Sequence, residues 1–216
     1  MRLRDGDPTG YDEVTARLRS SYDAGAELRD GMDKQYWKLA EREAFLDRLR
    51  AIGARTLLEI GAGTGEDGLF FRDEGGLRVV VVDLAPAMVE RCRAKGLEAY
   101  VRDFLNLGFP ASAFDAVYAM NSLLHVPNAD LGAALRAVRD VLEPGGLGYL
   151  GMYGGQAAQG VAEDDVQEPT RFFAFRTDEQ ILRAAAAAFE IVDFHTVTDG
   201  EIRFQALTVA RAAETA

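Results

Sequence analysis

The sequence contains a single cysteine, Cys92, among its 216 residues. One cysteine excludes an internal disulfide, which favours a reducing compartment. No apolar run approaches the roughly 20 residues that a membrane-spanning helix needs, and the run Val79 to Val82 is typical of a buried strand. The opening residues also lack the apolar core of a signal peptide. We therefore expect a cytoplasmic protein with no membrane partner.

Positive charge is also scarce. Lysine occurs only at positions 34, 38 and 95, and the 24 basic residues are outnumbered by 35 acidic ones, for a net charge of −11. A chain of this sign repels phosphate backbones, so nucleic acid is not an expected partner. The composition is otherwise that of a globular protein, and the length suits one domain with a short extension.

The chain divides into three parts by pattern. Residues 1–10 are polar and rich in turn formers, and we expect them to be mobile. Residues 11–54 carry helical periodicity and form an N-terminal helical extension that stops at Gly53. From residue 55 to 211, short apolar runs alternate with helical stretches. The third part is therefore expected to be an α/β domain with crossover connections.

The apolar runs predict a mostly parallel sheet. Five of them, at 56–60, 78–82, 97–101, 114–120 and 147–152, are separated by helical segments, one of which begins at Pro86 and another at Asn128. Two further runs flank Asp199-Gly200, which is a hairpin signal and requires one antiparallel strand near the C-terminus. Thr177 and Gln180 form a capping-box pattern ahead of the hairpin.

The most specific motif is a glycine loop. Glu59-Ile60 ends the first strand and is followed by Gly61, Gly63 and Gly65, then by a helix that starts with Glu66-Asp67. Such a loop lets a ligand approach the backbone closely. Because the acidic helix start disfavours a pyrophosphate, a positively charged ligand without phosphates fits better than a dinucleotide. A loop that only packs helix on strand is the structural alternative.

Two carboxylates follow the next strands. Asp83 ends the second strand and is suited to accept hydrogen bonds from both hydroxyls of a ribose, or alternatively to cap the helix at Pro86. Asp103 follows the third strand, where it and the Phe104 backbone amide are placed to contact an adenine edge. A surface aspartate in a turn is the alternative for Asp103.

Taken together, these motifs resemble those of class I S-adenosylmethionine (SAM) dependent methyltransferases. The resemblance extends over about residues 35–210 and includes Phe114-Asp115 and the turn Leu142-Glu143-Pro144-Gly145-Gly146. It implies a doubly wound, Rossmann-like sheet of seven strands, with SAM as cofactor and S-adenosylhomocysteine as product. It also implies the cofactor-binding residues, which are Glu59, Gly61, Gly63, Gly65, Asp83, Leu84, Met88, Asp103, Phe104, Met120 and Asn121.

The sequence signals for binding the methyl acceptor are less specific than those for the cofactor. His125 follows the fourth strand and is the best candidate for a general base, with a structural histidine as the alternative. A long segment from Tyr153 to Arg176 shows no periodicity and is expected to cover the substrate. The expected substrate-binding residues are Tyr22, Trp37, Tyr153, Arg171 and Phe173; packing roles are the alternative for Trp37 and the phenylalanines. No metal site is expected.

The resemblance and the motifs favour methylation of a small organic acceptor at oxygen or nitrogen by in-line transfer. An NAD(P)-dependent oxidoreductase is the alternative from another enzyme class. A SAM-binding protein without methyl transfer is the third possibility, because the cofactor motifs do not separate it from a transferase. The acceptor and the oligomeric state stay open.

Overall fold

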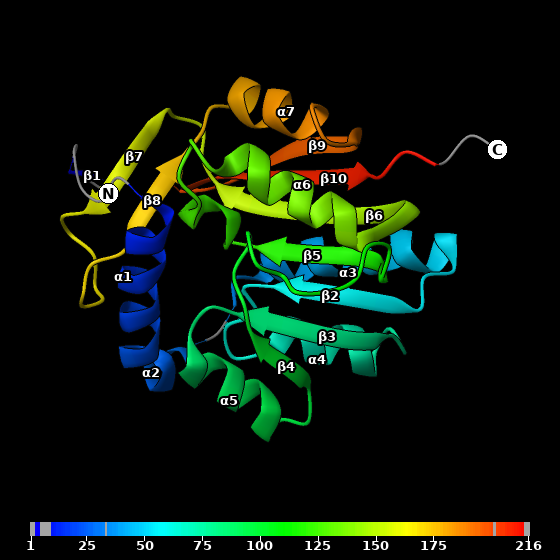
Figure 1. Ribbon diagram of the computed structural model, residues 1–216, viewed down its shortest axis with the longest axis horizontal. Coiled ribbons are helices and arrows are strands. Elements are labelled where there is room, and N and C mark those ends of the chain that lie inside the picture. The colour runs from blue at the N-terminus through cyan, green and yellow to red at the C-terminus, as the bar shows by residue number, and fades with distance from the viewer. Residues whose placement is uncertain (1–2, 5–9, 33, 201, 214–216) are drawn as a thin grey trace.

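The computed structural model describes residues 3–4, 10–32, 34–200 and 202–213. Its centre is a sheet of seven strands, which lie side by side in the order β4 (Glu98–Val101), β3 (Arg78–Asp83), β2 (Thr56–Ile60), β5 (Phe114–Met120), β6 (Leu142–Tyr153), β10 (Ile202–Ala210) and β9 (Glu190–Asp199) (Figure 1). The first five pair in parallel, and β10 is antiparallel to both β6 and β9. The predicted Rossmann-like sheet with one antiparallel strand is confirmed.

Helices cover both faces of the sheet. On one face lie α3 (Tyr36–Ile52), α4 (Glu66–Asp73) and α5 (Pro86–Ala94), and on the other lie α6 (Leu131–Val141) and α7 (Asp178–Ala186). Val80 and Val82 pack into the α6 side, whereas Val79 and Val81 pack into the α3–α5 side. Both faces are buried, so the strand is a continuous apolar run rather than an alternating one.

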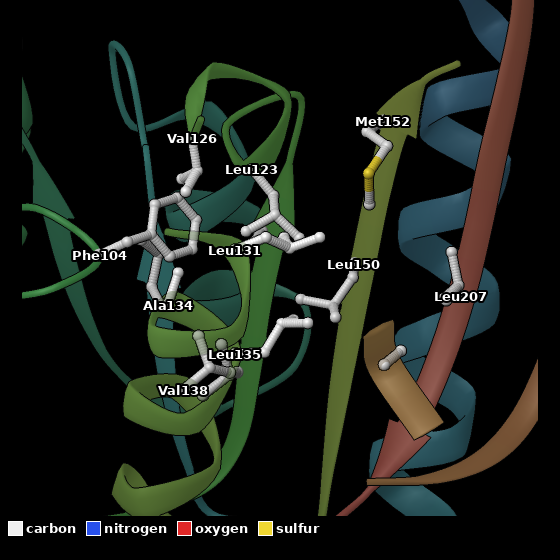
Figure 2. Close-up of a cluster of buried hydrophobic side chains, with 14 of the residues drawn as sticks. Phe104, Leu123, Val126, Leu131, Ala134, Leu135, Val138, Leu150, Met152 and Leu207 are labelled. Atoms are coloured by element: carbon white, nitrogen blue, oxygen red, sulfur yellow. The ribbon is translucent and has the colours of Figure 1, made fainter. Parts of the chain in front are cut away.

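The α6 side is tightly filled. Leu131 and Leu135 of α6 lie beside Leu150 of β6, with Met152 farther along the same strand (Figure 2). The helix begins at Leu131 after the N-cap residue Asp130, two residues later than the expected cap at Asn128. The side-chain oxygen of Asn128 instead accepts a hydrogen bond from Arg176 Nε at 2.9 Å.

Local signals elsewhere in the sequence are confirmed. Gly53 ends α3 with φ 68°, in the left-handed region that glycine adopts without strain. Thr177 and Gln180 form the complete capping box of α7. The expected mobility of residues 1–10 falls largely outside the described residues, but Leu3–Arg4 form β1, a short strand.

The segment from Tyr153 to Arg176 differs from expectation because it contains two strands, β7 (Ala158–Ala162) and β8 (Phe172–Phe175). With β1 they form a second, three-stranded antiparallel sheet. Strand β7 escapes sequence patterns because it is built of small residues. Gly160 is required there, since a Cβ atom would lie 2.3 Å from the Arg4 carbonyl oxygen.

The small sheet and two N-terminal helices gather at one end of the large sheet. Helices α1 (Tyr11–Ala24) and α2 (Ala26–Asp30) lie at the end toward which the arrowheads of β3 and β5 point (Figure 1). A short 3₁₀ helix, η1 (Leu123–His125), follows β5 at the same end and contacts β8. The carboxyl ends of the parallel strands are therefore covered by segments from both ends of the sequence.

Arg176 holds this cover in place with no acidic partner among the described residues. It is 2% exposed, and its guanidinium donates to Asn128 Oδ1 and to the carbonyl oxygens of Leu123, Ala174 and Val126, at 2.5 to 3.4 Å. Burial lowers its pKa to about 10, and its donors satisfy carbonyl groups that have little access to water. The side chain thus joins η1 to β8.

Replacing Arg176 with methionine should lower the free energy of unfolding by about 2–4 kcal/mol, because buried carbonyl groups lose their donors. Urea unfolding followed by circular dichroism measures this. Arg183→Met is the control: Arg183 pairs with Glu179 on exposed α7 surface, and its loss should cost less than about 0.5 kcal/mol. Equal effects of the two substitutions would contradict the joining role.

Candidate functional site

A cavity of about 440 Å³ lies at the carboxyl ends of β2, β3 and β5, beneath α1 and α2. This volume is typical of a small-molecule site. Most of the residues expected from the sequence line it together: Glu59, Gly61, Gly63, Asp83, Leu84, Met88, Asp103, Phe104, Met120, Asn121, His125, Tyr22, Tyr153, Arg171 and Phe173. Residues more than 100 positions apart in the sequence thus share one wall.

Two expected site residues lie elsewhere. Gly65 faces Leu97 and Cys92, where an added Cβ would lie 2.8 and 3.0 Å from their side-chain atoms, so it serves helix–strand packing. Trp37 is 4% exposed, packs on Phe204 and donates from Nε1 to Asp199 at 3.0 Å. Neither residue lines the cavity, because core packing takes up their surfaces.

The glycine loop is tied to the neighbouring strand by a carboxylate. The Gly63 N–H donates to Asp83 Oδ2 at 2.8 Å, and the Ala85 N–H donates to Oδ1 at 2.9 Å. Asp83 therefore fixes the turn before α5 and lines the cavity, but it does not cap the helix, whose N-cap residue is Ala85 without a side-chain cap. Burial raises the pKa of Asp83 to about 6, against the lowering effect of these N–H donors.

Two oxygen atoms in the cavity wall lack hydrogen-bond partners within the described part of the chain. They are Glu59 Oε2 and Asn121 Oδ1, both inaccessible to solvent. Burial, followed by the charge of nearby Asp67, raises the pKa of Glu59 well above its usual range. Buried acceptors without donors are costly, so this wall suits a ligand that brings donors or positive charge.

Asp103 organises the turn after β4. Its Oδ1 accepts hydrogen bonds from the Tyr11 hydroxyl and from the Leu105 N–H, both at 2.9 Å. This ties α1 to the edge of the cavity and fixes Phe104, which is buried and lines it. The role of Tyr11 carries no sequence signal, because a lone tyrosine at a helix start is common.

His125 is held at both ring nitrogens. Nδ1 lies 2.6 Å from the Phe172 carbonyl oxygen, and Nε2 lies 2.6 Å from the Tyr22 hydroxyl. A carbonyl only accepts, so Nδ1 carries the proton; Nε2 then accepts from Tyr22. The histidine is neutral: burial lowers its pKa to about 3, despite the raising effect of the Phe172 carbonyl.

Tyr22 lies at the centre of this wall. Its hydroxyl donates to His125 and lies 3.4 Å from Arg171 Nη1, a long hydrogen bond in which it accepts. Arg171 is paired with Asp165, whose side chain is 1% exposed, through two contacts of 2.8 and 2.7 Å. The acidic run at 163–165 thus contributes one buried partner to this wall.

The cavity also contains cations that the sequence interpretation missed. Arg29, Lys34 and Lys38 line it, on α2, α3 and the segment between them. Lys34 pairs with Asp67 at 2.6 Å, and Lys38 lies over the rings of Trp37 and Tyr153. Their positions depend on how α2 and α3 fold back over the strand ends, which no local pattern reveals.

The described residues lack two kinds of feature. None of the helices combines the length and apolar character needed to cross a bilayer. Within the same residues, no group of three or more His, Cys, Asp or Glu side chains is arranged to hold a metal ion.

Comparison with known proteins agrees with this geometry. A family model described as a methyltransferase domain matches residues 57–146. The 27-O-demethylrifamycin SV methyltransferase of Amycolatopsis mediterranei is 32% identical over 159 residues, which cover 62% of this chain and 57% of the relative. The chain thus spans less than two thirds of the length of this relative.

Solved structures share the fold over nearly the full length. One is the Burkholderia thailandensis 1,6-didemethyltoxoflavin-N1-methyltransferase with bound 1,6-didemethyltoxoflavin and S-adenosylhomocysteine (TM-score 0.75, 21% identity, covering 97% of this chain and 94% of that one). Another is the [4+2]-cyclase SpnF (TM-score 0.73, 19% identity, covering 98% and 100%). Residues 57–146 are thus similar in sequence to a methyltransferase domain, and the sheet order and the solved structures show the fold of class I SAM-dependent methyltransferases.

Proposed function

We propose that this protein transfers a methyl group from SAM to a small organic acceptor, at oxygen or nitrogen. The observation that carries the proposal is the strand-end cavity, in which Asp83 is bonded to the glycine loop while Glu59 and Asn121 present unpartnered oxygen atoms. Residues 55–211 would form the SAM-binding unit. Helices within 11–54 would supply part of the acceptor wall.

The residues present fit SAM as the cofactor. Asp83 would accept from the two ribose hydroxyls, and Glu59 and Asn121 would accept from the ammonium of the methionine half. Leu84, Met88 and Phe104 supply apolar surface for the adenine, and Asp103 lies beside them in the cavity wall. When bound, SAM supplies a methyl group already activated by a positively charged sulfur.

The remaining work of the protein is to orient the acceptor and exclude water. Tyr22, Tyr153 and Phe173 supply aromatic surface to the cavity wall. The cover formed by α1, α2 and β8 leaves a volume suited to a small molecule rather than a macromolecule. The net charge of −11 supports the same choice against nucleic acid.

His125 would act through Tyr22 rather than on the acceptor directly. Its Nε2 lone pair is engaged by the Tyr22 hydroxyl, so a proton from the acceptor would reach His125 only by way of that hydroxyl. His125 therefore serves first as a positioning residue, which orients Tyr22 in the cavity. A general-base role for His125 stays a prediction.

The oxidoreductase alternative is less well supported. Glu66 and Asp67, in the first turn of α4, pair with Lys34 and Arg42, so these two carboxylates balance the two cations near the loop. An acidic helix start is unfavourable for a pyrophosphate. The third possibility, SAM binding without methyl transfer, is decided by assaying transfer itself.

Calorimetric titration should show binding of SAM and S-adenosylhomocysteine and no binding of NAD⁺. Asp83→Ala should weaken SAM binding by about a hundredfold, because two charge-assisted hydrogen bonds and the tie to Gly63 are lost. Labelled SAM incubated with phenols, amines and carboxylic acids then tests transfer.

The matched control is Asp140→Ala, on the exposed side of α6, which should leave SAM affinity unchanged. Thermal unfolding of both variants checks that the fold is retained. Unchanged SAM affinity in folded Asp83→Ala would contradict the ribose role, and binding of NAD⁺ alone would reverse the proposed class.

The two histidines give an internal comparison for the protonation of the site. Although burial lowers it, hydrogen bonds to Glu41 and Asp193 raise the pKa of His195 above its usual value. In ¹⁵N NMR between pH 5 and 8 we expect His195 to titrate and His125 to stay neutral with its proton on Nδ1. Titration of His125 in this range would contradict the neutral Tyr22–His125 pair.

A further inference from the structure

Arg29 is a cation in the cavity that the proposed cofactor contacts do not use. It lies in α2 and lines the cavity, with its guanidinium carbon 4.7 Å from the centre of the Tyr22 ring. Its Nε is inaccessible to solvent and has no hydrogen-bond partner among the residues that the structure describes. A buried donor without an acceptor is unfavourable unless a ligand supplies one.

The neighbouring acids are already engaged. Asp30, next to Arg29 in the chain, pairs with Lys95 at 2.6 Å and with Arg91 at 3.1 Å. Asp83 accepts from two backbone N–H groups. Arg29 therefore has no ion pair within the described part of the chain, although the carboxylate of Asp83 is near enough to interact with its charge.

The other hydrogen-bond donors around Tyr22 already have acceptors. The single Tyr22 hydroxyl proton goes to His125 Nε2, and Arg171 makes its two shortest side-chain contacts with Asp165. A ligand oxygen in this part of the cavity would therefore meet Arg29 as its main free donor. A guanidinium with free N–H groups recognises a carboxylate with good geometry.

The charge of Arg29 affects the pKa values of groups on both sides of the cavity. Burial dominates the pKa shifts of Asp83 and His125, raising the first and lowering the second, and the charge of Arg29 lowers both. An anion bound at Arg29 would lie in the cavity beside the Tyr22 ring.

We propose that the methyl acceptor carries an anionic group, a carboxylate or one of like geometry, and that Arg29 binds it. The inference rests on the proposed function and adds a substrate class to it. The contrast in charge supports the assignment: the unpartnered acceptors, Glu59 and Asn121, lie at the ends of β2 and β5, whereas the unpartnered donor lies on α2 beside Tyr22.

The test measures binding of matched acid and amide pairs to the protein saturated with S-adenosylhomocysteine. The probes are 4-hydroxybenzoate with 4-hydroxybenzamide, and salicylate with salicylamide, each titrated by calorimetry. We expect at least one acid to bind tenfold or more tightly than its amide. In Arg29→Met this preference should fall to within about twofold, and Arg29→Lys should retain part of it.

The control is Arg139→Met, which removes the same charge from the exposed surface of α6 and should leave the acid preference intact. The proposal is overturned if no acid binds, if acids and amides bind equally, or if Arg29→Met keeps the preference.

A separate SAM titration distinguishes failure of the proposed function from failure of the Arg29 assignment. Wild-type protein that fails to bind SAM contradicts the proposed function itself. If SAM binds wild type but Arg29→Met weakens SAM binding tenfold or more, Arg29 holds the carboxylate of the cofactor and the acceptor assignment is wrong. We expect SAM affinity to change less than threefold.

Discussion

The candidate site depends on one carboxylate, that of Asp83. It ends β3, accepts from the N–H groups of Gly63 and Ala85, and so fixes the glycine loop, the strand end and the start of α5 relative to one another. Burial disfavours its charge and the N–H donors favour it. The group is thus held in a position where further donors, such as ligand hydroxyls, have a strong effect.

Around this carboxylate the cavity is divided by charge. Glu59 and Asn121 present acceptors from the strand ends, whereas Arg29 presents a donor from the helical cover. A cationic cofactor and an anionic acceptor would each find the complementary side, and their mutual attraction would bring the reacting groups together. The same division explains why Tyr22, between the two sides, is held so firmly by His125.

Most of the fold could be predicted because its signals are local. Gly53, the capping box at Thr177 and the Asp199-Gly200 hairpin each determine the backbone near themselves. That Glu59, Asp83 and Asp103 line one cavity could also be predicted, because the carboxyl ends of parallel strands meet at one edge of the sheet. The acceptor side could not, because Arg29 and the small strand β7 are positioned by contacts between distant segments.

The role of Asp83 is tested most directly by measuring the pKa of its carboxyl group by ¹³C NMR, with and without SAM. The account predicts a pKa of about 6 in the free protein and a lower value with SAM, because ribose hydroxyls donate to the charged form. A pKa in the ordinary range in the free protein, or one that SAM leaves unchanged, would contradict it.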